Sequence, residues 1–240
     1  MSKDYAKITH IFHSGFLVET ENHTLIFDYI EPKNYDKRIS DDFFINKENS
    51  FIFVTHSHKD HFYSKIYDWS KYNSELIYIL SNDIIPNHSE PNIYLMEKYN
   101  NLKIKEAEIT TYGTTDKGVS FLVKVDGINI YHAGDLNWWH WKSDSSTTQK
   151  KEEIEFKQEV DNLKNVNIDI AFIPVDPRLE EFYYLAAEYF AKTIKPQVIV
   201  PMHFEDNFEI THNLKGKLKD IKCHIVSLDE NNYKFNFKKK

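Results

Sequence analysis

Cysteine is nearly missing from this sequence, whose 240 residues include one, Cys223. A single cysteine excludes an internal disulfide and a zinc site built from several thiolates. Glycine and proline are scarce too, at six and seven residues, and no stretch is enriched in them as a flexible linker would be. No segment repeats at the spacing of a solenoid protein. These absences predict that residues 1–240 form a single domain.

Long apolar runs and an excess of positive charge are absent as well. No uninterrupted apolar stretch approaches the roughly 18 residues that a membrane-spanning helix needs, and the opening MSKDYAKITH lacks the apolar core of a signal peptide. The formal net charge of −7 offers no overall basic field to nucleic acid or anionic lipid. We interpret the basic C-terminal KFNFKKK as a solvated tail. The sequence therefore predicts a cytoplasmic location without a membrane partner, and it disfavours a nucleic-acid partner.

What the sequence does contain is a series of short apolar runs separated by helical patterns. FIFVT and ELIYIL predict two buried strands, and the segment between them predicts a helix with Phe62, Ile66 and Trp69 on one face. A second strand–helix–strand unit consists of IDIAFIPV, the amphipathic LEEFYYLAAEYFAKTI and QVIVPM.

Other segments complete an α/β pattern. KKEEIEFKQEVDNLKNV places Phe156, Val160 and Leu163 at helical spacing, and VSFLVKV and INIYHAGD form a predicted hairpin that turns at Asp126-Gly127. Hairpins early in the chain with helices interleaved later favour two sheets that lie between outer layers of helices.

The stretch HSHKDH follows the predicted strand FIFVT and contains four potential metal ligands, His56, His58, Asp60 and His61. In an extended segment, residues 56, 58 and 60 point to one side. Nitrogen and carboxylate donors without a thiolate suit Zn²⁺, Mn²⁺ or Fe²⁺ better than a soft metal. A lone histidine is usually an ordinary surface or capping residue, but this density of donors favours a metal site.

Further ligands must come from elsewhere in the chain. Asp135 ends INIYHAGD and His203 ends QVIVPMH, so both directly follow predicted buried strands. Ligands gather beyond the carboxyl ends of strands in open α/β sheets, where both residues and the HSHKDH motif are expected. The sequence contains no HExxH zinc motif, P-loop, GxGxxG or GxSxG motif.

These motifs resemble those of the metallo-β-lactamase superfamily, whose signature is HxHxDH. ITHIFHSGFLVETENHTLIFDY resembles the opening hairpin of that superfamily, with Asp28 as its support aspartate, and YHAGD and VPMHF resemble its later motifs. HSGF, YHAGD and PMH together are most similar to the branch that contains the ascorbate-phosphate lactonases and many metal-dependent hydrolases. The resemblance implies a four-layer αββα sandwich with one or two divalent ions. It implies six ligands, namely His56, His58, Asp60, His61, the bridging Asp135 and His203.

One expected ligand is absent from its place. The superfamily usually supplies another histidine between the first motif and the bridging aspartate, but the corresponding ITTYGTTDKGVSF contains none. His88 stands too early in the chain. We take Asp116 as the candidate replacement, with a plain turn residue before Gly118 as the alternative.

Four further features near these motifs are candidates for a role at the site. His13 lies next to Ser14-Gly15 in the segment that resembles the opening hairpin, and it is either close to the metals or a hydrogen-bonding core histidine. His132, three residues before Asp135, is a candidate proton donor to the leaving group. The tryptophan-rich LNWWHW is either core or a pocket wall. Arg178 either contacts an anionic substrate group or lies on the surface.

The resulting hypothesis is a hydrolase in which a metal-activated hydroxide, oriented by Asp60 and Asp135, cleaves an ester, lactone or phosphoester of a small anionic molecule. Zinc is the favoured ion, with manganese and iron as alternatives. A metal-binding sensor or scaffold without activity is the main alternative function, and an RNA or DNA phosphodiesterase is disfavoured by the net charge. The predicted partner is a small-molecule substrate, and assembly into a homo-oligomer is left open.

Overall fold

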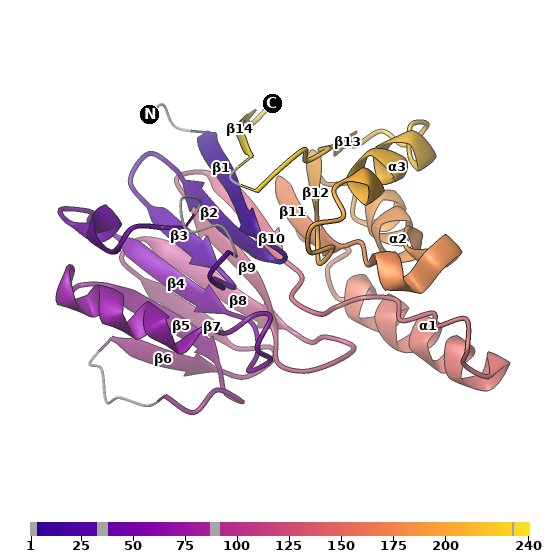
Figure 1. Ribbon diagram of the computed structural model, residues 1–240, viewed down its shortest axis with the longest axis horizontal. Coiled ribbons are helices and arrows are strands. Elements are labelled where there is room, and N and C mark those ends of the chain that lie inside the picture. Colours follow the sequence, from indigo (N-terminus) through magenta and orange to yellow (C-terminus); the bar gives the residue numbers. More distant parts are fainter. Residues whose placement is uncertain (1–3, 33–37, 87–91, 232) are drawn as a thin grey trace.

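The fold is a four-layer sandwich, in which two facing seven-stranded sheets carry helices on their outer sides (Figure 1). It is seen in a computed structural model that describes residues 4–32, 38–86, 92–231 and 233–240. The predicted αββα architecture is therefore confirmed. His88, which we excluded as a ligand, lies outside the described residues.

The first sheet contains an antiparallel hairpin region followed by parallel strands. Its order is β14-β1-β2-β3-β4-β5-β6, and all pairs from β3 to β6 are parallel. The strands are β1 (Tyr5–Phe12), β2 (Gly15–Glu19), β3 (Thr24–Phe27), β4 (Ser50–Val54), β5 (Ile77–Ser81), β6 (Ile93–Met96) and β14 (Lys234–Lys238).

The second sheet mirrors this arrangement in the order β13-β12-β11-β10-β9-β8-β7, with β10 to β13 parallel. Its strands are β7 (Asn101–Ile104), β8 (Ala107–Tyr112), β9 (Ser120–Val125), β10 (Ile128–His132), β11 (Ile170–Pro174), β12 (Val198–Met202) and β13 (His224–Ile225). The predicted hairpin is confirmed: Asp126 and Gly127 join β9 to β10 with φ of 48° and 80°, as a type I′ turn requires.

The outer layers differ in the kind of helix that they contain. The α-helices α1 (Ser146–Asp161), α2 (Leu185–Thr193) and α3 (Glu209–Lys217) lie beside the second sheet, whereas the first sheet is covered by the 3-10 helices η2 (Asp41–Phe44) and η3 (Ser64–Lys71) (Figure 1). Two residues of the predicted helical face, Phe156 and Val160, are buried in α1, and Leu163 is buried in the turn after the helix, which ends at Asp161.

Strand β4 explains how the first metal motif is delivered. Phe51 and Phe53 pack into the core between the sheets, whereas Ile52 and Val54 pack against the outer η2 and η3 layer. Because both faces of this parallel strand are buried, its sequence is continuously apolar. The strand therefore ends with Thr55 and the HSHKDH loop at the edge of the sandwich.

Three sequence expectations about local structure were wrong. KFNFKKK is not a solvated tail, because β14 pairs with β1 and buries Phe237 in the core. The helix expected after the HSHKDH loop is present as a 3-10 helix, but it begins at Ser64, so Phe62 lies outside the helical face on which it was placed. The helix expected from Leu179 is broken at Glu180, whose φ is 51°, so that η4 (Pro177–Phe182) precedes α2. In each case tertiary packing overrides the local pattern.

A search of the described ranges found no helix that is both long and apolar enough to cross a membrane.

Candidate metal centre

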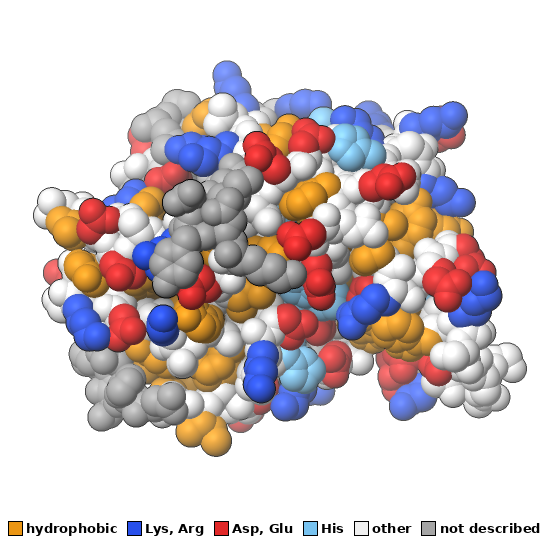
Figure 2. Space-filling view, viewed as in Figure 1, with side chains coloured by type: hydrophobic (Ala, Val, Ile, Leu, Met, Phe, Trp, Pro, Cys, Tyr) orange, Lys and Arg blue, Asp and Glu red, His pale blue; other side chains and the backbone are white. Residues whose placement is uncertain are grey.

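The candidate site lies at one edge of the sandwich, where the carboxyl ends of β4, β10 and β12 meet the turn between β1 and β2. Asp135, which follows β10, contacts His56 and His61 after β4 and His203 after β12. On the face shown in Figure 2, histidine and acidic side chains gather near the middle. The expectation that these motifs converge is therefore met by the fold.

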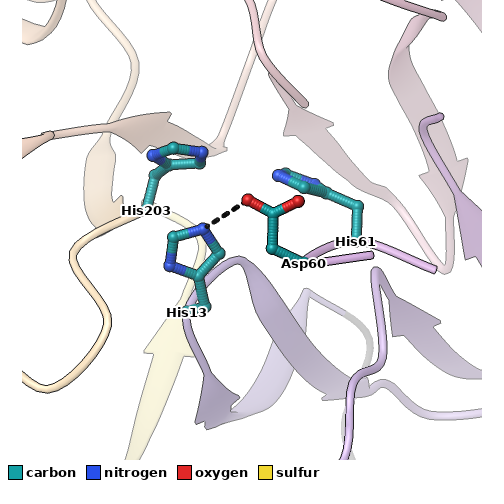
Figure 3. A group of neighbouring side chains, drawn as sticks. All are labelled: His13, Asp60, His61 and His203. Carbon is teal, nitrogen blue, oxygen red and sulfur yellow. Dashed lines mark ion pairs between the residues drawn. The ribbon is translucent and has the colours of Figure 1, made fainter. Parts of the chain in front are cut away.

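The more buried half of the site is here called the inner position. Three of its side chains, Asp60, His61 and His203, point toward a common space together with the ring of His13 (Figure 3). His61 and His203 are almost fully buried. The ligand atoms of His13, Asp60, His61 and His203 lie within 4.8 Å of one another, and one carboxylate oxygen of Asp135 contacts His61 and His203. The name inner position refers to Asp60, His61, His203 and this oxygen of Asp135, and it does not include His13.

The more exposed half is here called the outer position. His58 Nδ1 lies 3.0 Å from His56 Nε2 and 3.8 Å from a carboxylate oxygen of Asp116. The side chains of His58 and Asp116 are 41% and 44% exposed, whereas His56 is buried. The outer position consists of His56, His58, Asp116 and the other carboxylate oxygen of Asp135.

Asp135 lies between the two positions. Its Oδ1 is 3.1 Å from His61 Nε2 and 3.4 Å from His203 Nε2, and its Oδ2 is 3.4 Å from His56 Nε2. Two donor atoms that bind one ion at about 2.1 Å lie roughly 3.0 to 3.4 Å apart in octahedral or tetrahedral geometry. The spacing of these atoms therefore fits ligands of a shared metal centre, with Asp135 as the bridge.

Buried carboxylates orient two of the inner rings. His61 Nδ1 donates to Asp28 at 2.7 Å, and His203 Nδ1 donates to Asp176 at 3.2 Å. In the neutral form of each ring the proton is thereby fixed on Nδ1, which leaves the lone pair of Nε2 directed into the site. Asp28 has the supporting place that the resemblance implied for it.

Thr55 has the same effect on His56. Its hydroxyl donates to Asp28 at 2.7 Å and therefore accepts the Nδ1 proton of His56 at 3.0 Å. His56 Nε2 is therefore directed into the site, where it contacts His58 Nδ1 at 3.0 Å and Asp135 Oδ2 at 3.4 Å. Sequence reasoning missed Thr55 and Asp176, although both follow a buried strand directly and that position was the available signal.

A tight backbone contact brings the outer loop to this place. Gly118 has φ of 73°, and a Cβ there would lie 2.0 Å from the carbonyl oxygen of Thr55. Val119 N donates to the same carbonyl at 3.0 Å. Only glycine permits this approach, and it sets Asp116 opposite His58.

The donor set fits a divalent ion. Among the described residues, His61 Nε2 and Asp135 Oδ1 are buried atoms without a hydrogen-bond partner, although they lie 3.1 Å apart as an ion pair. Buried polar atoms are seldom left unpaired unless an ion, water or ligand satisfies them. Imidazole and carboxylate donors with no thiolate suit zinc, manganese and iron.

Charge pairing holds these groups together. Burial opposes a charge on His61, but Asp135 and Asp28 outweigh it and raise the pKa of His61 to about 10. Burial would likewise raise the pKa of Asp135 and of Asp28, yet the neighbouring histidines, His61 first, lower both. The metal-free centre is thus a compact cluster of opposite charges.

The two residues predicted to act in catalysis lie in different surroundings. Asp60 is half-exposed and faces the cavities, and the neighbouring His13 ring is the main cause that lowers the pKa of Asp60. His132 is fully buried, where it donates to Ser14 O at 2.9 Å and accepts from Gly134 N at 3.2 Å. Its role as a proton donor stays a prediction, and these backbone contacts favour a supporting role.

Two cavities open onto the centre. The first cavity, of about 410 Å³, is lined by residues of both the inner and the outer position and also by Trp139, Trp141 and Glu152. The second, of about 440 Å³, is lined by His13 and by the segment after β12. Arg178, Asp60 and His203 line both. The tryptophan-rich loop therefore forms a pocket wall, at Trp139 and Trp141.

Comparison with known proteins identifies the class. The model of the beta-lactamase superfamily domain matches residues 7–203, so the chain belongs to this superfamily. The chain is 26% identical over 210 residues to a UPF0173 metal-dependent hydrolase from Pyrococcus furiosus, covering 82% of this chain and 84% of the relative. A relative of the same name from Nanoarchaeum equitans is 23% identical over 93% of this chain and 98% of its own length.

A solved structure supports the fold. Igni18, a metallo hydrolase from Ignicoccus hospitalis, superposes with a TM-score of 0.67 at 16% identity, covering 98% of this chain and 100% of its own. The predicted family and class, a metal-dependent hydrolase of the metallo-β-lactamase fold, are confirmed.

Proposed function

We propose that this protein hydrolyses an ester, lactone or phosphoester bond of a small anionic molecule, with divalent ions held at the inner and outer positions. The observation that carries the proposal is the placement of Asp135, whose two oxygens face the ligand atoms of separate positions at 3.1 to 3.4 Å. A bound divalent ion at such a site supplies Lewis acidity and lowers the pKa of a coordinated water.

The side chains of the centre orient the reacting groups. Asp60 and Asp135 are carboxylates whose pKa values are lowered by neighbouring histidines, so both accept hydrogen bonds at neutral pH. Asp60 is half-exposed and lies where both cavities meet. It can therefore orient a water molecule toward a bond that enters from either cavity.

Arg178 supports an anionic substrate. Its guanidinium is held by the buried Asp176 and lies 5.7 Å from the ring of Trp141, and its side chain is still 62% exposed. Among the described residues that line the two cavities, it is the only lysine or arginine. A fixed guanidinium binds carboxylate or phosphate in two-pronged geometry.

The tryptophan wall of the cavity suits a flat or apolar group. Trp139 and Trp141 are parallel within 4°, with ring centroids 5.8 Å apart, and both line the cavity at the outer position. Such faces bury apolar surface at low entropic cost. The substrate that we propose therefore combines an anionic group near Arg178 with a compact apolar part.

The two positions supply matching donor sets, each with two histidine nitrogens and two carboxylate oxygens, and Asp116 completes the outer set. Such sets suit zinc, manganese and iron. We therefore propose Asp116 as a ligand of the outer ion.

The experiment begins with elemental analysis of protein purified without added metal. The same protein is then assayed with mono-4-nitrophenyl succinate, a carboxylated γ-lactone and 4-nitrophenyl phenyl phosphate. We expect one or two bound ions per chain and turnover of at least one substrate. Bound metal without turnover on any of them would contradict the proposal and support the metal-binding scaffold instead.

The anionic preference is tested by Arg178→Ala. Loss of a charge-assisted hydrogen bond should lower kcat/KM for the succinate monoester about tenfold. The loss for neutral 4-nitrophenyl acetate should be much smaller. Lys192→Ala, on the surface of α2 beside Glu188, serves as the control and should leave both substrates unaffected. Equal losses on the charged and neutral esters in the Arg178 variant would refute the role of its charge.

A further inference from the structure

His13 occupies an unusual backbone position at the centre. It lies in the turn between β1 and β2 with φ of 53°, a conformation that costs energy for a residue other than glycine. Its carbonyl accepts from His203 N at 3.2 Å, so the turn of the first sheet is joined to the segment after β12 of the second. The ring is thereby held beside Asp60, His61 and His203 (Figure 3).

The proton of the His13 ring is on the opposite nitrogen from the protons of the ligand histidines. His56, His61 and His203 each donate from Nδ1 to an oxygen, which leaves Nε2 as the acceptor. His13 instead accepts from the backbone N–H of Glu205 at Nδ1, over 3.2 Å. A neutral ring that accepts at Nδ1 must carry its proton on Nε2.

That Nε2–H points into the site. Nε2 lies 3.6 Å from an oxygen of Asp60, which is longer than a direct hydrogen bond. It is a buried atom with no hydrogen-bond partner in the part of the chain that the structure describes. His13 also lines the cavity of about 440 Å³ together with Arg178 and His203. A buried donor with no partner beside a cavity indicates that a ligand atom completes it.

We propose that His13 is a catalytic hydrogen-bond donor and not a further ligand of the inner ion. Its Nε2–H contacts the leaving-group oxygen of the substrate in this cavity and stabilises the negative charge that develops there as the bond breaks. This role rests on the proposed function, because it requires hydrolysis at the inner position. It requires no proton transfer from His13.

Metal ligation by His13 would require a different hydrogen-bond arrangement. The lone pair would have to be on Nε2 and the proton on Nδ1, where it would face the N–H of Glu205. Two donors in contact would lose the bond that fixes the ring. If His13 acts as a donor instead, it keeps the hydrogen bond that its Nδ1 accepts from Glu205 N.

The first arm of the test measures metal binding. His13→Ala and His13→Gln should retain the metal content of the wild type and an affinity within about threefold of it, measured by competition with a chelator. The visible spectrum of the Co²⁺-substituted protein should be unchanged. His203→Ala is the positive control and should lose the inner ion. A loss of metal or an altered Co²⁺ spectrum in both His13 variants would overturn the proposal.

The second arm compares leaving groups. His13→Ala should lower kcat about 100-fold for phenyl acetate, whose leaving group needs stabilisation, and less than tenfold for 4-nitrophenyl acetate. His13→Gln places an amide N–H near the same point and should recover part of the loss. His212→Ala, at a surface pair with Asp229, is the matched control and should behave as the wild type.

The outcomes separate this role from the proposed function. A wild type that binds metal but hydrolyses neither these esters nor any of the three anionic substrates above would overturn the proposed function, and the donor role with it. An active wild type whose His13→Ala variant loses the same factor on both esters would overturn the donor role alone. Failure of His13→Gln to recover any activity would count against the donor as well.

Discussion

Two aspartates at opposite ends of β10 have contrasting surroundings. Asp126 precedes the strand and accepts from Thr20 Oγ1, from the backbone and side chain of Asn22 and from His23 Nδ1, at 2.6 to 2.9 Å. Asp135 follows it and lies among three histidines, yet its Oδ1 has no hydrogen-bond partner within the described ranges. Each of these aspartates belongs to a cluster of histidine and aspartate side chains that joins the two sheets.

The difference shows which clusters are built for a ligand. At Asp126 the bonds close on themselves, and the second nitrogen of His23 is paired with Lys105 O at 2.9 Å. At Asp135 the free atoms converge on one space. A closed cluster contributes to stability, whereas an open one is completed by a ligand and contributes to function.

The largest expected effect is that of Asp135→Ala. Removing the bridge should abolish binding of at least one ion and reduce hydrolysis by roughly 1000-fold or more, because the ions can no longer be held at the spacing that the chemistry needs. Elemental analysis and the ester assay measure both. Metal content and turnover like those of the wild type would show that Asp135 is not the bridge.

Asp116→Ala should have an intermediate effect within the open cluster. The exposed outer position loses a donor, so one ion should be lost while the inner ion stays, and turnover should fall about 10- to 100-fold. Asp116→His restores the histidine that the superfamily usually has and should tighten zinc binding. Unchanged stoichiometry in both variants would return Asp116 to the status of a turn residue.

Asp126→Ala should lower stability and leave metal binding unchanged, whereas Asp135→Ala should mainly affect metal binding and activity. Loss of a carboxylate with several hydrogen bonds should lower the free energy of unfolding by about 2 kcal/mol, or roughly 5 °C in Tm. Metal content should be unchanged. Thermal unfolding and elemental analysis of the same preparation test this, and a loss of metal would break the contrast between the clusters.

The smallest expected effect is on the pH dependence of stability. Burial alone would raise the pKa of Asp126, but its hydrogen bonds from His23, Thr20 and Asn22 lower it in the folded state. Because the folded-state pKa is lowered, the Asp126 carboxylate adds to the free energy of unfolding at pH values above the unfolded pKa of 3.8. This contribution is lost as the pH falls below that value.

The difference in Tm between wild type and Asp126→Asn should therefore be constant from pH 7 to about 5 and shrink toward pH 3. A difference that grows as the pH falls would mean that the folded-state pKa is raised instead.

The comparison also shows how far sequence reasoning reached. The density of donors in HSHKDH and the strands before Asp135 and His203 were sufficient to predict the centre, because chain-local motifs and strand ends are visible in sequence. The tautomer of each histidine ring could not be predicted from the sequence, because it depends on hydrogen-bond partners such as Asp28 and Asp176 that are distant in the chain.

Local patterns failed where distant contacts outweigh them. KFNFKKK has the charge of a solvated tail, but pairing with β1 makes it a strand. Asp116 could be read as a turn residue or a ligand, and only the close approach of Gly118 to Thr55 sets it opposite His58.

The sequence by itself determined the family, the two-sheet core and the ligand types, because periodicity and donor chemistry are properties of neighbouring residues. The tertiary structure decided which histidines present a lone pair and which presents a proton. It also decided that the hydrogen bonds around Asp126 form a closed cluster, whereas the cluster around Asp135 is left open for a ligand. Those distinctions depend on hydrogen bonds between segments that meet only when the two sheets pack together.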